Sequence, residues 1–352
     1  MTTLILIFGI LFGATLISAR LNKYNVISGQ AMLQNFTVLK ALLTAIGIGA
    51  VLIYIEVWTG VAGFHIKPFV AGGIILGGLF FGAGMAVLGY CPGTMAVSLG
   101  EGSLDALTGI IGGIAGGIFY TLIEPAIKNI AGPNLGDLTL YSFAGNFNHV
   151  FVLIFVLIFG FICVYIAFLI NKREKDHKRS WFFAGIALAL LNSLVFLKST
   201  SNRPVGASTS YPYVGDWLTG LTNNSYFLKI ETPGRWELIF LTGAFIAGLV
   251  LALVRGEFRF TLIHSNWRKY KGSSKIKRTI WAFAGGFVLI LGARLAGGCT
   301  SGHILSGGMQ LALSSLTFAF VTFLSLIITG AAFYRPLRTT KTSDINDTGM
   351  AE

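Results

Sequence analysis

Two of the three cysteines lie in short motifs of small and hydroxyl-bearing residues. Cys91 stands in Gly-Tyr-Cys-Pro-Gly-Thr at residues 89–94, the first cysteine motif, and Cys299 in Gly-Gly-Cys-Thr-Ser-Gly-His at residues 297–303, the second cysteine motif. A neutral thiol is a weak hydrogen-bond donor, whereas a thiolate is a nucleophile. The motifs therefore suit either loose binding of a polar solute or covalent sulfur chemistry. Cys163 lies in an apolar run, which is typical of a packing residue.

The two motifs belong to a repeated stretch of sequence. Seven positions of the first stretch recur in the same register 208 residues later, since Gly77, Gly78, Gly84, Gly89, Cys91, Ser98 and Gly100 are matched by Gly285, Gly286, Gly292, Gly297, Cys299, Ser306 and Gly308. Glycine is common in this chain, with 45 of 352 residues, but a rare cysteine in the same register is not expected by chance. We interpret the two stretches as copies of one structural unit.

Each copy is predicted to contain a helix that breaks at its cysteine. Pro92 suits the first turn of a new helix, where a missing N–H costs nothing. Thr94, Thr300 and Ser301 are residue types that cap helix starts or donate to a ligand. Two half-helices that begin at these motifs would present free backbone N–H groups and the positive ends of their dipoles. If they face each other, they form a receptor for an anion.

Two ionisable residues accompany the second cysteine motif. Arg294 lies five residues before Cys299 in an apolar run, and an intramembrane charge usually faces the protein interior and marks a functional site. Its alternative role is a structural ion pair with a carboxylate such as Glu56 or Asp105. His303 is expected either to donate to a ligand or to cap the half-helix. Two cysteines and one histidine fall short of the about four ligands that a metal site needs, so we expect no metal and no cofactor.

The elements that carry these motifs are apolar segments. Hydrophobic residues make up 54% of the chain and charged residues only 11%, against about 25% in soluble domains. This composition argues against a soluble enzyme, a disordered protein and a nucleic-acid-binding protein. A membrane crossing needs about 20 residues, and nine segments reach or approach that length: residues 3–19, 38–58, 69–90, 104–122, 149–170, 181–198, 236–254, 279–298 and 310–333. We expect an all-α integral membrane protein with about nine transmembrane helices.

Lysine and arginine gather in alternate connections. The connections after the first, fifth and seventh segments, together with the C-terminal tail, hold 18 of them, and the connections on the other side hold six. Because basic connections stay in the cytoplasm, the N-terminus is expected outside and the C-terminus inside. The net charge of +12 is thus a topology signal, and no nucleic acid is expected as a partner. Five crossings separate the two copies, which predicts two inverted repeats of the kind found in transporters.

These residues carry a resemblance to the YeeE/YedE family of bacterial membrane proteins of sulfur transport, which includes thiosulfate transporters. The resemblance rests on the first cysteine motif, and on the second where it follows Gly292-Ala293-Arg294-Leu295-Ala296, and it spans both copies. It implies nine or so spans with re-entrant half-helices that dip from both faces into a narrow centre. It also implies thiosulfate uptake across the inner membrane, with Cys91 and Cys299 handling the ion through S–H hydrogen bonds.

The chain departs from the family pattern in the connection after the first segment. The resemblance implies a further cysteine there, but residues 20–29 contain no thiol. Asn25 or Ser28 is expected to stand in as a polar group. The departure leaves a selenium species or another reduced sulfur compound as alternative substrates. A membrane sulfurtransferase that uses Cys91 or Cys299 is the alternative function.

The chain is expected to divide into a first repeat half at 1–171, a linking span and external loop at 172–235, a second, inverted half at 236–334 and a cytoplasmic tail at 335–352. In the external loop, Arg203 and nearby Ser and Thr residues are interpreted as a capped, solvated loop, with an anion vestibule as the alternative. The basic connection at 255–278 carries Phe260 and Trp267 among its cations, as an interfacial segment on anionic lipid does. A docking surface for a cytosolic sulfur-handling protein is the alternative there.

The predicted function is import of an inorganic sulfur anion, and no enzymatic activity is expected. The predicted substrate path consists of residues from the two motifs and the segment before the second: Cys91, Pro92, Gly93, Thr94, Arg294, Gly298, Cys299, Thr300, Ser301 and His303.

Overall fold

The computed structural model describes residues 1–127, 131–141, 148–174 and 178–335. Within these ranges every regular element is a helix, and β pairing is limited to isolated bridges, so the expected all-α class is confirmed. The helices in chain order are α1 (Thr2–Ser18), α2 (Tyr24–Ala31), α3 (Thr37–Trp58), α4 (Ala71–Leu88), α5 (Pro92–Gly100), α6 (Leu104–Ile127), α7 (His149–Glu174), α8 (Ser180–Phe196), α9 (Ser210–Thr219), α10 (Ser225–Val254), α11 (Ser265–Lys271), α12 (Lys275–Leu295), the π-helix η2 (Thr300–Gly307) and α13 (Leu313–Phe333).

Seven helical stretches in the described part of the chain are long and apolar enough to cross a membrane. They are α3, α4 taken together with α5, α6, α7, α10, α12 and α13. The helices α1 and α8, which correspond to the first and sixth expected segments, have 17 residues each and are shorter. All nine expected segments are therefore helical, and seven of them are long and apolar enough to cross the membrane in the described residues.

The connection expected to be a solvated external loop, residues 199–235, is largely helical and partly buried. It contains α9 and the first eleven residues of α10, which begins at Ser225 and not near residue 236. The Asn224 side chain caps α10, because its oxygen accepts a hydrogen bond from the Phe227 N–H at 2.7 Å. Residues 205–211 are buried throughout. The interpretation of this segment as a solvated loop is therefore wrong, since its small residues pack inside the bundle.

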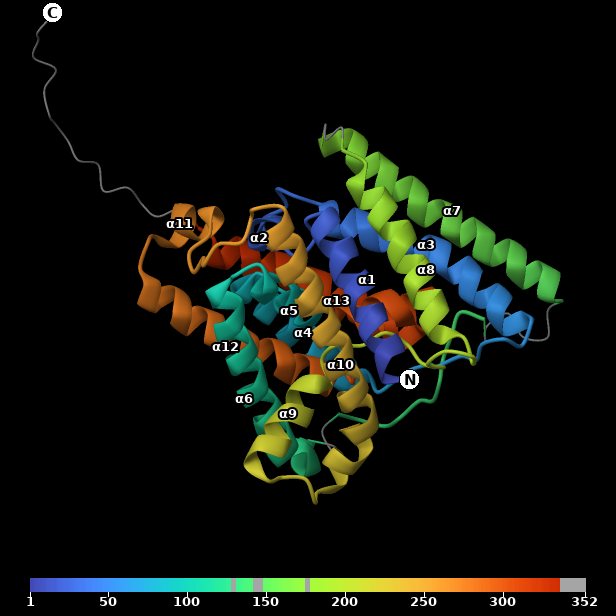
Figure 1. The fold of residues 1–352 in the computed structure, drawn as a ribbon. Helices are drawn as coiled ribbons and strands as arrows, with labels where there is room; N and C mark the ends of the chain where they lie inside the picture. Colours follow the sequence, from blue (N-terminus) through green and yellow to red (C-terminus); the bar gives the residue numbers. More distant parts are fainter. Residues whose placement is uncertain (128–130, 142–147, 175–177, 336–352) are drawn as a thin grey trace, which may run out of the picture.

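The helices α4 and α5 lie in the centre of the bundle, and α12 runs in from its edge to pack beside α4 (Figure 1). The helix α4 packs between α12 and α13, α6 covers α12, α1 packs on α10, and α3 packs on α7 and α8. Two repeat-matched glycines let α4 and α12 meet backbone to backbone. A Cβ at Gly84 would lie 2.5 Å from the Leu289 nitrogen, and one at Gly292 would lie 2.4 Å from the Phe81 nitrogen. Small residues at such crossings are typical of packed membrane helices.

A buried ion pair fastens the end of α4 just before the first cysteine motif. The Arg278 Nη2 and the Asp105 Oδ2 are 2.6 Å apart, and both side chains are fully buried. The same nitrogen donates to the Leu88 carbonyl at 2.7 Å. Because Arg278 belongs to α12, Asp105 to α6 and Leu88 to α4, one guanidinium joins three helices. A cation at the carbonyl end of α4 also complements the helix dipole.

The outer faces of several helices are apolar, as lipid-facing surfaces are. On α7, for example, the Phe161 side chain is 71% exposed. In the basic connection, Phe260 is exposed, but Trp267 is fully buried and its ring lies 4.8 Å from the Arg278 guanidinium carbon. Trp267 therefore packs inside the protein and is not part of a lipid-facing segment. The predicted cytoplasmic tail, apart from Arg335, lies outside the described residues, as do Lys128 and Lys175 of the charge count.

Candidate functional site

The first cysteine motif is a tight turn between α4 and α5. Gly89 ends α4 in the left-handed conformation, with φ of +79°, which glycine adopts without strain. Cys91 is extended and Pro92 opens α5, as predicted from the sequence. The Thr94 hydroxyl accepts from the Cys91 N–H at 2.8 Å and donates to the Cys91 carbonyl at 3.0 Å. Thr94 therefore fixes the backbone around the half-buried Cys91.

The second cysteine motif repeats this geometry up to the cysteine and then differs. Gly297 is also left-handed, with φ of +75°, and Cys299 is also extended. The helix that follows is the π-helix η2, where the sequence predicted an α-helical half-helix. Cys299 is 1% exposed, and its sulfur shares a hydrogen bond of 3.3 Å with the Ser301 hydroxyl. π-helical turns are wide and are frequent at functional sites.

His303 braces the second motif from inside the protein. Its Nε2 lies 2.7 Å from the Ala296 carbonyl, which can only accept, so this nitrogen carries the proton. The Nδ1 therefore accepts from the Ser315 hydroxyl, at 2.9 Å. The ring is fully buried and stacks on Phe318. Both ring nitrogens are occupied, which favours the bracing role over direct donation to a ligand.

Arg294 is buried at the end of α12 without the carboxylate partner that the sequence suggested. Asp105 pairs with Arg278, and Glu56 accepts from Ser193, so neither proposed partner serves Arg294. The guanidinium instead donates to the Thr209 hydroxyl at 3.0 Å and the Ser208 hydroxyl at 3.1 Å. These two contacts explain why the segment before α9 is buried. The predicted ion pair between Arg294 and Glu56 or Asp105 is therefore wrong.

Lys67, in the connection between α3 and α4, contacts the second motif and was not among the predicted residues. Its ammonium donates to the Gly297 carbonyl. A Cβ at Gly298 would lie 2.9 Å from the Lys67 Cε, so the missing side chain at Gly298 makes room for the lysine. Burial, together with the nearby Arg294 charge, lowers the pKa of the Lys67 ammonium to about 8. This contact joins residues 230 positions apart, and no local signal in the sequence points to it.

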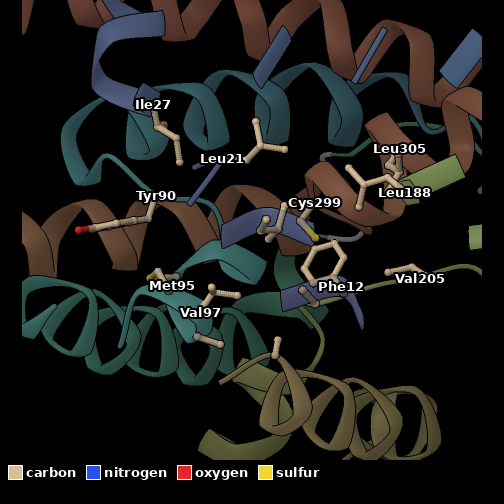
Figure 2. Packing of buried hydrophobic residues seen from close by; sticks show 14 of the residues in the cluster. Phe12, Leu21, Ile27, Tyr90, Met95, Val97, Leu188, Val205, Cys299 and Leu305 are labelled. Carbon is tan, nitrogen blue, oxygen red and sulfur yellow. The ribbon is translucent and has the colours of Figure 1, made fainter. Parts of the chain in front are cut away.

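A cavity of about 190 Å³ lies where the two motifs meet. Cys91, Gly93 and Thr94 reach it from the first motif, and Thr300 and Ser301 reach it from the second. The rest of its wall is mostly apolar and comes from α1, α2, α3, α4, α8, η2 and α13, together with Leu21 before α2. Cys299 does not line the cavity and lies in the adjoining apolar cluster with Phe12 (Figure 2).

The two thiols lie near each other, and the Tyr211 hydroxyl lies near both. Tyr211 belongs to α9, and its hydroxyl donates to the Pro92 carbonyl at 2.9 Å. The chain between α8 and α10 thus reaches the centre of the bundle. Cys163 lies elsewhere: it packs against α3, where a Cβ at Gly47 would lie 3.0 Å from the Cys163 Cβ.

The polar group that α2 contributes to the cavity is Gln30 and not Asn25 or Ser28. Asn25 and Ser28 both bond to Asn266 near the start of α11, and neither lines the cavity. Gln30 lines it, is 5% exposed, and has a side-chain oxygen without a hydrogen-bond partner among the described residues. The expectation that Asn25 or Ser28 replaces the additional cysteine is therefore not supported by their positions.

Comparison with known proteins agrees with this architecture. A family model described as Sulphur transport matches residues 18–328, which include both cysteine motifs. The chain is also 26% identical over 329 residues to the thiosulfate transporter TsuA of Spirochaeta thermophila, and this match covers 88% of the chain and 92% of the relative. The seven long apolar helices and the family match identify a multi-pass membrane protein. This chain belongs to the Sulphur transport family.

Proposed function

We propose that this protein imports thiosulfate across the inner membrane, with its N-terminus outside and its C-terminus in the cytoplasm. The anion passes through the centre of the bundle, between the two cysteine motifs. The observation that carries the proposal is the shared cavity, because residues of both motifs line the same space of about 190 Å³. A solute in that space contacts both copies of the repeat at once.

The surroundings of the two short helices support an inverted arrangement of the copies. The end of α5 meets the basic connections, since Glu101 pairs with Lys23 at 2.8 Å and its carbonyl accepts from the Arg259 N–H. The chain after η2 meets the connection between α3 and α4, where the Gln310 side chain accepts from the His65 N–H at 2.6 Å. The connection with Lys23 precedes α3 in the chain, with α2 between them, and the connection with His65 follows α3, whose 22 residues span about 33 Å. We infer that α5 and η2 begin near the middle and run toward opposite faces.

The motif residues hold the anion loosely. Neutral thiols are weak donors, so Cys91 stabilises the sulfur or oxygen atoms of thiosulfate without trapping them. The first N–H groups of α5 and its dipole add positive potential beside Cys91. Cys299 does not line the cavity and acts on the anion indirectly, through its hydrogen bond to Ser301, which does. A mostly apolar wall offers the dianion no further strong partner, which favours release.

Three polar atoms near this cavity support a polar occupant. The side-chain oxygens of Gln30, Thr300 and Thr322 have no hydrogen-bond partner among the described residues, although all three residues line the cavity. Buried polar groups are rarely left without a partner. The threonine hydroxyls would donate to an anion as it passes, and Gln30 would donate through its amide nitrogen, since its oxygen only accepts. In this proposal Gln30 takes the place of the additional cysteine of the family.

Uptake of ³⁵S-thiosulfate in cells that lack other importers tests the proposal. Cys91→Ala should reduce uptake at least about tenfold, because removal of the thiol takes away a donor in the centre of the path. Cys299→Ala should reduce it by a smaller factor. Cys163→Ala is the matched control, since this thiol packs between α3 and α7, and it should transport normally. Full uptake by the Cys91→Ala, Cys299→Ala double variant would refute the thiol role.

Competition and mass spectrometry separate the alternatives. Unlabelled thiosulfate should compete with the label more strongly than selenite or sulfite. If a selenium species competes better, the substrate assignment is wrong and the path assignment stands. Persulfide retained on Cys91 or Cys299 of the purified protein after exposure to thiosulfate would instead indicate a sulfurtransferase. We expect both thiols to be recovered unmodified.

A further inference from the structure

The short helix α9 packs between α6 and α10 (Figure 1). Small residues of α6 let it come close, because a Cβ at Gly117 would lie 2.7 Å from the Pro212 nitrogen, and one at Gly113 would lie 2.9 Å from the Tyr211 ring. Such close crossings are typical of packed membrane helices. The position of α9 therefore depends on direct contact with α6.

The first turn of α9 supports the first cysteine motif. The Tyr211 hydroxyl donates to the Pro92 carbonyl at 2.9 Å, and Tyr211 is buried. Pro92 directly follows Cys91 in the turn between α4 and α5. A movement of α9 relative to α6 would therefore reach the turn that carries Cys91.

Asp216, near the other end of α9, is a buried carboxyl group without a cation. It is fully buried, and its Oδ1 has no hydrogen-bond partner among the described residues. In the part of the chain that the structure describes, no lysine, arginine or histidine nitrogen lies within ion-pair distance of it. An ionised carboxylate is costly to bury without such partners. This site therefore disfavours the charged form of Asp216.

The hydrogen bonds of the other oxygen fit a neutral carboxyl group. The Thr121 hydroxyl lies 2.9 Å from the Asp216 Oδ2 and 3.2 Å from the Gly117 carbonyl, but its single proton serves only one of them. A carbonyl only accepts. If Thr121 donates to Gly117, the contact with Asp216 needs a proton on Oδ2, which then donates to the Thr121 oxygen. In that arrangement every hydrogen of the chain has an acceptor, and Oδ1 is an uncharged carbonyl oxygen.

The groups around Asp216 supply no compensating charge. Burial raises the pKa of the Asp216 carboxyl to about 6, although the Thr121 hydrogen bond lowers it. Tyr226 of α10 faces Asp216, and its ring lies 5.2 Å from that of Tyr120 of α6. Arg294 faces Tyr226. The charged residues of α6 and α10 around α9 are exposed, half-buried or bonded elsewhere: Glu124, Lys229, Glu231, Arg235 and Glu237.

We propose that Asp216 is a binding site for an external proton, and that this proton keeps α9 docked on α6 and the first cysteine motif supported. When the proton leaves to external water, a buried carboxylate with one donor remains. This favours movement of α9 away from α6, which takes the Tyr211 hydroxyl from the Pro92 carbonyl. The inference rests on the proposed function for the outer position of α9 and for its effect on transport, whereas the proton site does not depend on the substrate.

Infrared difference spectroscopy of the purified full-length protein in nanodiscs, without thiosulfate, tests the proton site. The carbonyl stretch of a protonated carboxyl should be present at pH 5 and lost by pH 8, with a midpoint near pH 6. It should be missing in Asp216→Asn. Asp137→Asn is the matched control, since Asp137 is an exposed carboxyl in the connection after α6, and it should keep the band. Absence of the band in the natural protein would overturn the inference, as would its loss on addition of Na⁺ at constant pH.

Amide hydrogen exchange tests the docking of α9. At pH 7.5 the amides of α9 should exchange at least about tenfold faster in the natural protein than in Asp216→Asn, which stays neutral, because release of the proton shifts the docking equilibrium. At pH 5 the two proteins should exchange alike. Equal exchange at both pH values would overturn the role of the proton in docking.

Uptake of ³⁵S-thiosulfate by proteoliposomes with a fixed internal pH tests the link to transport. The maximal rate of the natural protein should fall at least about fivefold between external pH 5.5 and pH 7.5, as Asp216 loses its proton. The concentration for half-maximal uptake should not change over this range, because Asp216 does not line the cavity. The rate of Asp216→Asn should be independent of pH, and Asp137→Asn should follow the natural protein. The natural pH profile in Asp216→Asn would overturn the link. If none of these proteins takes up thiosulfate, the proposed function fails, and the infrared and exchange results still decide the proton site.

Discussion

At the first cysteine motif the chain continues into a regular α-helix, whereas at the second it continues into a π-helix. Both turns begin with a left-handed glycine in the same repeat register, and both cysteines are extended. The backbone up to each cysteine is therefore shared. What differs is the set of side chains that holds each turn.

A threonine inside the motif holds the first turn, and Arg278 holds the end of the helix before it. The second turn is held from inside by His303 and from the other side by Lys67. The charge at the first turn is neutralised, because Arg278 is paired with Asp105. The charge at the second turn is not, since the nearby Lys67 and Arg294 lack carboxylate partners among the described residues. The two copies therefore differ in charge: the first turn is neutral and held by a buried ion pair, and the second turn is positively charged.

On the proposed transport path, this asymmetry would give the two copies different roles. A solute that arrived from outside would meet the positive turn first, where long-range attraction is useful. It would then meet the neutral turn with the more accessible thiol, Cys91, where weak binding would permit release. Two identical turns would either fail to attract the dianion or fail to let it go.

The largest expected effect, on the stability of the protein, comes from removing the buried ion pair between Arg278 and Asp105 that holds the end of α4. Arg278→Ala removes the guanidinium partner of the fully buried Asp105 carboxylate, which keeps only its contacts with His264 and Tyr90, and this should destabilise the protein by about 3–5 kcal/mol. The yield of monodisperse protein and the midpoint of thermal unfolding should both fall sharply. The exposed neighbour Lys277 is the control, and Lys277→Ala should behave like the natural protein. If Arg278→Ala unfolds at the natural temperature, the first turn is held by other contacts.

An intermediate effect is expected in the reactivity of the two thiols. Cys91 is half-buried and lines the cavity, while Cys299 is 1% exposed and bonded to Ser301. A small maleimide should therefore modify Cys91 roughly tenfold faster than Cys299, since access limits the reaction. Labelling is measured by mass spectrometry on the Cys163→Ala background, with and without thiosulfate. Thiosulfate should slow modification of Cys91, and faster labelling of Cys299 would reverse the assigned roles.

The sequence predicted those features that depend on local pattern. Each of the nine predicted apolar runs lies in a helix, and the glycine before each cysteine located both breaks, because left-handed turns favour glycine. Pro92 correctly marked the start of α5. The register of the two copies placed both motifs at corresponding points of the fold, even though residue types alone did not distinguish an α-helix from a π-helix after Cys299.

The features that the sequence did not predict depend on contacts between distant segments. Lys67 touches Gly297 across 230 residues, and Arg294 binds hydroxyls that precede α9. The segment around Ser208 has the small polar composition of a surface loop. It is buried because the buried Arg294 guanidinium needs hydrogen-bond acceptors, and Ser208 supplies one. Gln30 lines the cavity because α2 folds back against the bundle, which no periodicity in eight residues reveals.

The smallest expected effect is a dependence of thiosulfate affinity on external pH. Burial lowers the pKa of the Lys67 ammonium to about 8, so the group is charged at neutral pH and loses its proton as the pH rises through that value. The groups around it, Arg294, Arg203, Glu237 and the Cys299 thiol, all lie within electrostatic range. Affinity should therefore be full below about pH 7 and should weaken about fivefold by pH 9, since nine-tenths of the Lys67 side chains are then neutral.

Proteoliposomes with a clamped membrane potential and a fixed internal pH provide the measurement, with the concentration for half-maximal uptake determined at each external pH. Lys67→Arg keeps its charge throughout this range, so its affinity should change little between pH 7 and pH 9. Lys67→Met should already be weak at pH 7 and should also show no alkaline loss. An alkaline loss of the same size in all three proteins would assign the titration to another group, and the positive character of the second turn would then rest on Arg294 and Arg203 alone.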